Sequence, residues 1–225
     1  MADAKDEVVL SIRGMSKSFG RNRVLDHINL DVKRGTVMVL MSENDHGKST
    51  MMKCLFGTYQ KDEGKILLNG KEISFSGPKD ALENGIAMVH QELNQCLERN
   101  VIDNLFLGRY PTNSTGVVDE GRMKKKASEL FRKLGMTVDL TQPMRHMSVS
   151  QRQMCEIAKA ISYNSKVIVL DEPTSYLDIR HKIELLDILR EMTASRGLSV
   201  VLSLHEVDLA TKLADVVVLV KDNAI

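Results

Sequence analysis

The chain has 225 residues, 43% hydrophobic and 27% charged, which is enough to bury the core of one domain with a small inserted lobe. Its 31 Lys and Arg side chains nearly balance its 30 Asp and Glu side chains, which argues against a nucleic-acid partner. The amino end, MADAKDEVVL, is charged where a secretory signal is apolar, and no apolar run reaches the roughly 20 residues of a membrane span, so we expect the chain to stay in the compartment where it is made.

The first part of the chain predicts strands joined by turns and short helices. Apolar and polar residues alternate over 8–12 and 24–32, which indicates two half-buried strands. The apolar run TVMVLM predicts a strand buried on both faces, followed by a loop and the helix STMMKCLFG. Turn residues at 62–64 and 69–70 flank the strand KILL, Pro78 begins a short helix, and GIAMVH is a further strand.

The middle of the chain, from about 91 to 142, predicts a mostly helical insertion that includes MKKKASELFRKLG. After Pro143, helices and strands alternate: SQRQMCEIAKAIS, KVIVL, HKIELLDILREMTAS, LSVVLSL, HEVDLATKLA and DVVVLV. This alternation predicts a parallel α/β sheet with right-handed crossovers. The expected fold is therefore α/β, with a mixed sheet that has a parallel core.

Polar residues suited to phosphate chemistry follow four of the predicted buried strands, at the sheet edge where α/β proteins bind ligands. In HGKST, backbone amides open a helix, Lys48 can reach the outer phosphates, and the Ser49 hydroxyl can bind Mg²⁺. Asp171 is a hard oxygen ligand for Mg²⁺, and Glu172 can orient or deprotonate an attacking water. The residues that follow the other two strands are Gln91 and His205.

Each of these signals also has a structural explanation. GKST can occur by chance, an Asp–Glu pair can cap the next helix, and a lone His is more often a surface or core residue. The occurrence of all four on successive strand ends favours a nucleotide site over these explanations.

The segment MSVSQRQ, residues 147–153, resembles the signature motif, usually LSGGQ, of the ATP-binding cassette (ABC) ATPases. Ordinary P-loop kinases and GTPases lack this motif. The resemblance covers essentially the whole chain and implies a P-loop NTPase of the ABC type that forms one domain over 1–225. It further implies a RecA-like core over about 1–90 and 160–225 and a helical signature subdomain over about 91–159.

The resemblance also implies roles for individual residues. Glu172 would be the catalytic base, His205 the switch histidine and Gln91 the switch glutamine, while Ser49, Gln91 and Asp171 would bind Mg²⁺. Phe19 would stack on the adenine of ATP. The remaining ATP-binding residues would come from the phosphate loop, the signature and the D-loop: Ser42, Glu43, Asn44, Asp45, His46, Gly47, Lys48, Ser49, Thr50, Ser148, Ser150, Gln151 and Asp178.

In the mechanism that the resemblance implies, two cassettes close head to tail around two ATP molecules and open after hydrolysis. Each site combines the phosphate loop of one cassette with the signature of the other. The energy passes to separate transmembrane permease subunits docked against the helical subdomain, and an extracytoplasmic solute-binding protein is involved indirectly. The chain would then be a peripheral protein on the cytoplasmic face of the cell membrane, with ATP and Mg²⁺ as cofactors.

Two parts of the chain resemble different importers. Stretches between 17 and 166, such as ALENGIAMVHQELN, resemble the ATPases of galactose and methyl-galactoside importers, whereas EPTSYLDIRHKIELLDILR, after Asp171, resembles the cassettes of iron-siderophore or cobalamin importers. Because the helical subdomain that would meet the permease belongs to the first part, we favour a sugar importer of the galactose or ribose type and keep the iron-siderophore or cobalamin type as the alternative. A natural recombinant, an engineered chimera and a fragment are all compatible with this division.

The phosphate loop departs from the usual pattern GxxxxGK[ST], in which this family has a further glycine, because Ser42 and Asp45 occupy two glycine positions. A left-handed non-glycine residue costs about 1–2 kcal/mol, and a carboxylate about 4 Å from a phosphate charge is repelled by up to roughly 4 kcal/mol. We therefore expect weakened ATP binding, with Glu172 and His205 intact. The alternatives to an active ATPase are a nucleotide-binding or regulatory module without turnover and, disfavoured by the near-neutral charge, a soluble cassette acting on ribosomes or DNA.

Overall fold

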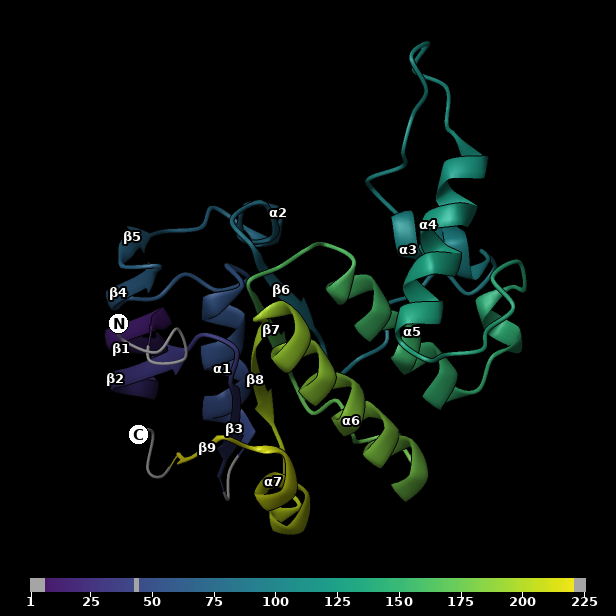
Figure 1. Ribbon diagram of the computed structural model, residues 1–225. Coiled ribbons are helices and arrows are strands. Elements are labelled where there is room, and N and C mark those ends of the chain that lie inside the picture. The colour runs from purple at the N-terminus through teal and green to yellow at the C-terminus, as the bar shows by residue number, and fades with distance from the viewer. Residues whose placement is uncertain (1–6, 43–44, 221–225) are drawn as a thin grey trace.

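The computed structural model describes residues 7–42 and 45–220, and Figure 1 shows their arrangement. Antiparallel strands form one sheet of order β2-β1-β4-β5, at the side of the molecule where the described chain begins. β4 and β5 are joined at Asn69 and Gly70, whose φ values of 50° and 75° fit the tight hairpin turn that this Asn-Gly pair predicts. The bounds of these strands are Val8–Phe19 for β1, Asn22–Lys33 for β2, Glu63–Leu68 for β4 and Lys71–Ile73 for β5.

The second sheet is parallel and has the order β6-β7-β8-β3-β9. Its inner strands consist almost wholly of buried residues, as expected for parallel strands that are covered on both faces. Their apolar side chains alternate between two core clusters, because successive residues of a strand point to opposite faces. The bounds of the strands are Val37–Met41 for β3, Ile86–Val89 for β6, Val167–Leu170 for β7, Ser199–Ser203 for β8 and Val216–Leu219 for β9.

Helices cover both faces of the parallel sheet. Helix α1 contributes Met51, Met52 and Leu55 to the cluster that also holds the antiparallel strands, so it lies between the two sheets. Helix α6 packs on the other face, through Leu185, Leu189 and neighbouring residues. The bounds of the helices around the two sheets are Asp45–Leu55 for α1, Pro78–Glu83 for α2, Ile179–Arg196 for α6 and Val207–Leu213 for α7.

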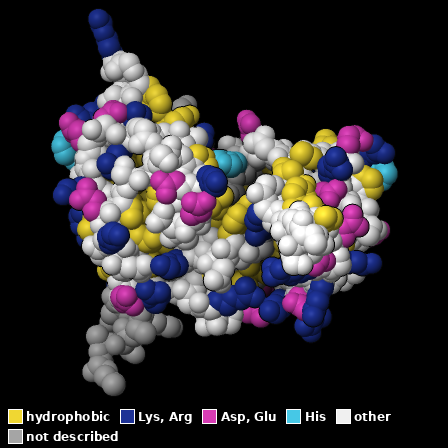
Figure 2. All heavy atoms as spheres, turned by 90° about the horizontal axis from the view of Figure 1, so that it is seen from above, with side chains coloured by type: hydrophobic (Ala, Val, Ile, Leu, Met, Phe, Trp, Pro, Cys, Tyr) yellow, Lys and Arg dark blue, Asp and Glu magenta, His cyan; other side chains and the backbone are white. Residues whose placement is uncertain are grey.

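A helical lobe, made of α3, α4, the 3-10 helix η2 and α5, lies between β6 and β7 in the chain and to one side of the parallel sheet (Figure 1). Seen from above, the molecule is hollowed between this lobe and the two sheets (Figure 2). Among the described helices, none combines the length and the apolar character needed to span a membrane. The bounds are Val101–Phe106 for α3, Glu120–Lys133 for α4, Met144–His146 for η2 and Val149–Ile161 for α5.

The predicted α/β fold, with a parallel core and a helical part, is confirmed with one difference. The antiparallel strands do not extend the parallel sheet into a mixed one but form a sheet of their own. The register of β1 against β2 shifts at four places, and such irregularities increase the twist of a strand. The twisted ribbon instead packs across α1, which buries apolar side chains from both sheets in one cluster.

Candidate functional site

The parallel register brings the carboxyl ends of neighbouring strands to one edge of the sheet. Asp171 follows β7 directly, and its backbone N–H donates to the carbonyl oxygen of Val89, the last residue of β6. Ser203 ends β8, which is paired with β7 on one side and with β3 on the other. The predicted residues that follow these strands therefore lie near one another, as expected for a ligand site of an α/β sheet.

Asp171 is buried, and two hydroxyl groups hold its carboxylate. The Oδ1 atom accepts hydrogen bonds from Ser49 Oγ at 2.9 Å and from Ser203 Oγ at 3.3 Å. Burial raises the pKa of Asp171, because a charged carboxylate loses its hydration, and the two hydroxyl donors oppose this rise. Ser49, at the start of α1, and Asp171, after β7, were both predicted to bind Mg²⁺, and they are in direct contact.

The carboxylate of Glu172 is held from three directions. Its Oε2 atom accepts from Gln91 Nε2 at 2.8 Å and from Ser175 Oγ at 2.9 Å. His205 Nε2 lies 3.0 Å from the other oxygen, Oε1, and donates to it when this ring nitrogen carries the proton. The three residues predicted to be catalytic, Gln91, Glu172 and His205, thus form one hydrogen-bonded group.

The backbone of Glu172 is in the left-handed region, with φ of 46°. For a residue with a Cβ this conformation costs on the order of 1–3 kcal/mol, and such residues cluster at functional sites. The N–H of Glu172 donates to Ser203 Oγ at 2.7 Å in a fully buried position. The hydroxyl of Ser203 therefore fixes Glu172 through its backbone and Asp171 through its carboxylate.

Lys48 is buried at 1% exposure and reaches back toward the end of β3. Its Nζ atom donates to Ser42 Oγ at 2.8 Å, which is a contact that a glycine at position 42 has no side chain to make. Ser42 is not among the non-glycine residues of positive φ in the described part of the chain, so the strain expected at this position is absent. The weakened ATP binding predicted for this loop therefore rests on the charge of Asp45 and not on backbone strain at Ser42.

The rest of the phosphate loop is described only in part. Gly47 is buried and Thr50 is 7% exposed in α1. Glu43 and Asn44, together with the side chains of Asp45 and His46, lie outside the described residues, so the predicted repulsion between Asp45 and a phosphate stays a prediction.

Phe19 lies at the end of β1 and is 44% exposed. Its ring meets that of Tyr59 edge to face, with the ring centroids 5.2 Å apart, and Lys17 Nζ lies 5.4 Å from the Phe19 centroid. The exposed ring is free to stack on a flat partner, as predicted for adenine. Within the described residues, no hydrogen bond or ion pair joins Phe19 or Tyr59 to the group around Glu172.

The predicted signature residues lie at the start of α5. Ser148 caps this helix, since its Oγ accepts from Gln151 N at 3.2 Å while Gln151 Oε1 accepts from Ser148 N at 3.0 Å. Asp178 caps α6 in a similar way by accepting from His181 N. Within the described residues, Ser148, Ser150, Gln151 and Asp178 make no hydrogen bond to Glu172 or Asp171, so one copy of the chain does not bring these residues into the group.

Sequence reasoning missed three side chains of this region. Ser175 and Ser203 bind Glu172, and Gln153, which is fully buried in α5, donates from Nε2 to the carbonyl oxygen of Pro173 at 2.7 Å. A serine ending an otherwise apolar strand, and a glutamine on the apolar face of a helix, are the signals that point to such buried polar contacts.

The comparisons with known proteins agree with this geometry. The ABC transporter family model matches residues 25–175. The galactose/methyl galactoside import ATP-binding protein MglA of Treponema denticola is 57% identical over 216 residues, which cover 96% of this chain and 43% of that protein. The chain therefore spans less than half the length of this relative. The match extends well past residue 170, into the part that was likened to iron-siderophore and cobalamin cassettes.

Solved structures show the same fold. A nucleotide-free ATP-binding cassette from an ABC transporter superimposes with a TM-score of 0.87 at 22% identity, covering 97% of this chain and 89% of that one. A bacterial ABC transporter cassette described as dimeric gives a TM-score of 0.82 at 19% identity, covering 96% of each chain. Since the family model covers most of the sequence and the fold agrees, this chain belongs to the ABC transporter family.

Proposed function

We propose that this chain binds and hydrolyses ATP as the motor subunit of a sugar importer. One observation carries the proposal: a buried carboxylate, Glu172, is held by Gln91, Ser175 and His205 directly beside the pair formed by Ser49 and Asp171. This arrangement supplies a fixed base next to hard oxygen donors at the start of a helix, where phosphate groups bind.

In this proposal Glu172 orients a water and accepts its proton as the oxygen attacks the γ-phosphate. His205, with its Nε2 atom 3.0 Å from Glu172 Oε1, and Gln91, with its Nε2 atom 2.8 Å from Oε2, keep the carboxylate aimed. Lys48 and the backbone N–H groups that open α1 neutralise charge on the outer phosphates. Such a reaction depends mainly on positioning and charge, so a single base suffices.

The oxygen donors beside the two acidic residues, Asp171 and Glu172, fit Mg²⁺. A serine hydroxyl, a glutamine amide and a carboxylate, from Ser49, Gln91 and Asp171, are the oxygen ligands that this ion prefers, and it commonly takes only one or two carboxylates from the protein. Within the described residues, no group of three or more His, Cys, Asp or Glu side chains could hold a metal ion. When bound with ATP, Mg²⁺ would neutralise charge on the phosphates.

The sugar specificity rests on the name of the relative from Treponema denticola, an import protein for galactose and methyl galactoside. The permease would dock on the helical lobe, in a groove of about 680 Å³ whose apolar rim includes Leu107, Tyr110 and Val118. These side chains are 38–44% exposed, and Figure 2 shows apolar side chains at the surface of this lobe. Exposed apolar patches of this kind mark protein–protein contacts.

The signature residues support a partner cassette. Ser148, Ser150, Gln151 and Asp178 make no hydrogen bond to Glu172 within the described part of one chain, and in this proposal they bind a nucleotide held by another cassette. A relative by fold is described as dimeric. In this proposal the core spans about 1–90 and 160–225, and the helical subdomain spans about 91–159. The chain sits at the cytoplasmic face of the membrane, and the solute-binding protein acts through the permease.

A second candidate, a nucleotide-binding or regulatory cassette with impaired turnover, is favoured by the contact between Lys48 and Ser42. The 2.8 Å hydrogen bond holds the ammonium group against the protein, so a phosphate must compete with the Ser42 hydroxyl for Lys48. With the charge of Asp45 nearby in sequence, this predicts weak ATP affinity.

The deciding experiment measures ATP affinity and hydrolysis for the wild-type chain, the Ser42→Gly/Asp45→Gly variant and the Glu172→Gln variant. We expect the double variant to bind ATP more tightly and Glu172→Gln to lose turnover by about 10²–10⁴-fold while still binding ATP. Unchanged affinity in the double variant would contradict the competition argument. Turnover that survives in Glu172→Gln would remove Glu172 as the base, and a wild-type chain that binds ATP without hydrolysing it would favour the second candidate.

A further inference from the structure

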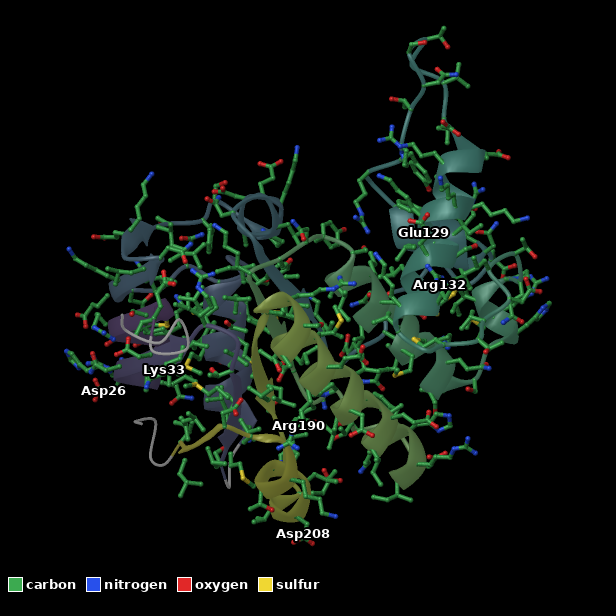
Figure 3. All side chains as sticks on the ribbon, viewed as in Figure 1. Asp26, Lys33, Glu129, Arg132, Arg190 and Asp208 are labelled. Atoms are coloured by element: carbon green, nitrogen blue, oxygen red, sulfur yellow. The ribbon has the colours of Figure 1, made fainter. Side chains whose placement is uncertain are left out.

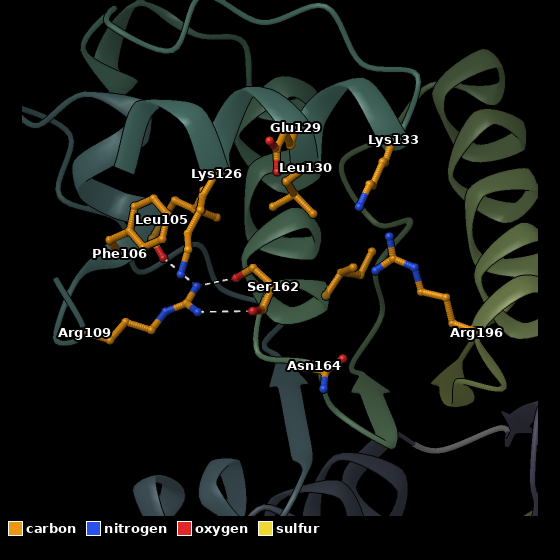
Figure 4. A pocket seen from close by; sticks show the side chains of 11 residues that line it. Leu105, Phe106, Arg109, Lys126, Glu129, Leu130, Lys133, Ser162, Asn164 and Arg196 are labelled. Atoms are coloured by element: carbon orange, nitrogen blue, oxygen red, sulfur yellow. Dashed lines mark hydrogen bonds between the residues drawn. The ribbon is translucent and has the colours of Figure 1, made fainter. Parts of the chain in front are cut away.

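A cavity of about 280 Å³ lies away from the carboxyl ends of the strands, between α3, α4, the end of α5 and the end of α6 (Figure 4). Its lining residues come from both the helical lobe and the core, because Arg196 is the last residue of α6. None of the residues assigned to ATP or Mg²⁺ lines it. The cavity is therefore separate from the site around Glu172.

The cavity is strongly basic. Four cationic side chains line it, and Glu129 is the one carboxylate among the lining residues, which leaves a net charge of +3. Figure 4 shows Lys126 reaching toward the guanidinium of Arg109 at one end of the cavity, and Lys133 and Arg196 pointing toward one another at the other end. Within the described residues, no ion pair joins these three side chains to a carboxylate. The fourth cation is Arg109.

Arg109 is held rigidly at one wall of the cavity. Its Nη1 donates to the carbonyl oxygen of Ser162 at 3.2 Å, and its Nη2 donates to the carbonyl oxygen of Leu105 at 2.8 Å and to Ser162 Oγ. The guanidinium also stacks on Tyr163, 3.9 Å from the ring centroid. Three of the five N–H donors are thus used, and Nε is buried with no hydrogen-bond partner in the described structure. Burial lowers the pKa of Arg109, which reflects a cation kept from water without a carboxylate partner.

We propose that this cavity binds the phosphate group of a small metabolite. A phosphate monoester carries nearly two negative charges and several acceptor oxygens, which match converging Lys and Arg donors. The volume lies just below the roughly 300–1,000 Å³ of ligand pockets, so it suits a phosphate with a short carbon chain rather than a nucleotide. The bound anion would link α4 of the helical lobe to α6 of the core.

The test compares two pairs of substitutions on the same helix. Lys126→Gln/Lys133→Gln removes two cavity charges, whereas Lys125→Gln/Arg132→Gln removes two charges at the same spacing that do not line the cavity. Figure 3 labels Glu129 and Arg132, of which only Glu129 lines the cavity. All four substituted side chains are exposed, so we expect both variants to fold.

Binding is measured by calorimetry with inorganic phosphate and with glycerol 3-phosphate, at an ionic strength held constant with potassium chloride. Because both variants keep the phosphate loop, binding there is common to them and cancels in the comparison. We expect the cavity variant to lose at least tenfold in affinity for one phosphate site, equivalent to about 1.4 kcal/mol, and the control variant to bind as the wild type does. We expect Arg196→Gln, from the core, to show the same loss.

The stability of the unliganded protein gives an independent readout. Lys126 and Lys133 repel the other cations of the empty cavity, so their removal should raise the melting temperature without phosphate and abolish the further rise on adding it. Equal phosphate binding by the cavity and control variants would overturn the proposal. A fall in unliganded stability in the cavity variant would also overturn it, because that is the result expected for side chains with a purely structural role.

Discussion

Replacing Ser203 by Ala tests whether one buried hydroxyl holds both acidic residues of the site. Ser203 is fully buried, and its Oγ accepts from Glu172 N at 2.7 Å and donates to Asp171 Oδ1 at 3.3 Å. The substitution leaves the N–H of Glu172 without its acceptor, at a residue whose φ of 46° needs support from its surroundings. It also removes one of the two hydroxyl donors to Asp171.

The expected loss of stability follows from these two contacts. A buried N–H without a partner costs about 1–3 kcal/mol, and the long hydrogen bond to the carboxylate adds about 1 kcal/mol, so we expect a total of roughly 2–4 kcal/mol. For a chain of this size that lowers the melting temperature by roughly 5–15 °C. We also expect Mg²⁺-dependent ATPase activity to fall about 10–100-fold, the usual effect of losing a group that orients a metal ligand.

The effect on stability should depend on pH. Because burial raises the pKa of Asp171 in the folded state above its ordinary 3.8, the folded protein is destabilised by this carboxylate once the pH exceeds that value. Ser203 favours the charged form, so its loss raises the pKa further and increases the penalty. The difference in unfolding free energy between wild type and Ser203→Ala should therefore be larger at pH 8 than near pH 4, as measured by urea unfolding.

Ser199→Ala is the matched control, since Ser199 is also fully buried, lies at the opposite end of β8 and accepts one backbone N–H, from Gly35 at 3.0 Å. We expect it to reduce stability by about 1–3 kcal/mol without a pH-dependent component and to leave ATPase turnover of the folded protein unchanged. If both variants reduce turnover equally, or if Ser203→Ala reduces neither stability nor turnover, then Ser203 does not position the two acidic residues.

Three further predictions concern other parts of the molecule. Phe19→Ala should weaken ATP binding by about 1–3 kcal/mol, the value of a lost base–aromatic stack. It should change the stability little, because the ring is 44% exposed. Equal ATP affinity of the variant and the wild type in equilibrium dialysis would contradict the stacking role. An alkylating reagent should label Cys96 alone in the native protein, because Cys96 is exposed, whereas burial raises the pKa of Cys54 to about 11 and of Cys155 to about 12. Peptide mass spectrometry after brief labelling measures which thiols have reacted. Equal labelling of the buried thiols would contradict this prediction. Gln153→Leu should lower the ATPase rate more than the affinity for ATP, because it frees the backbone beside Glu172, and a change in affinity alone would argue against this coupling.

The sequence predicts the order of strands and helices well because the apolar residues recur with clear helix or strand periodicity and turn residues separate these segments. The same periods place Gln91, Asp171, Glu172 and His205 after successive strands, and the structure brings Gln91, Glu172 and His205 into one hydrogen-bonded group. Ser203 was missed because it ends an apolar strand and interacts only with residues distant in sequence. The motif alone could not show that Ser42 lacks a positive φ, because a motif states which residue is usual at a position and not which φ the local backbone adopts.

The hydrogen bond between Gln153 and Pro173 connects the helical lobe directly to the site around Glu172. Gln153 lies in α5, and Pro173 is joined to Glu172 by a single peptide bond. A rotation of α5 that lengthens this 2.7 Å hydrogen bond displaces the backbone next to Glu172, which is already in an unfavourable conformation. The position of the Glu172 carboxylate therefore depends on the position of the lobe. In the proposed importer, a permease that tilts the lobe would in this way change the timing of hydrolysis without touching the nucleotide.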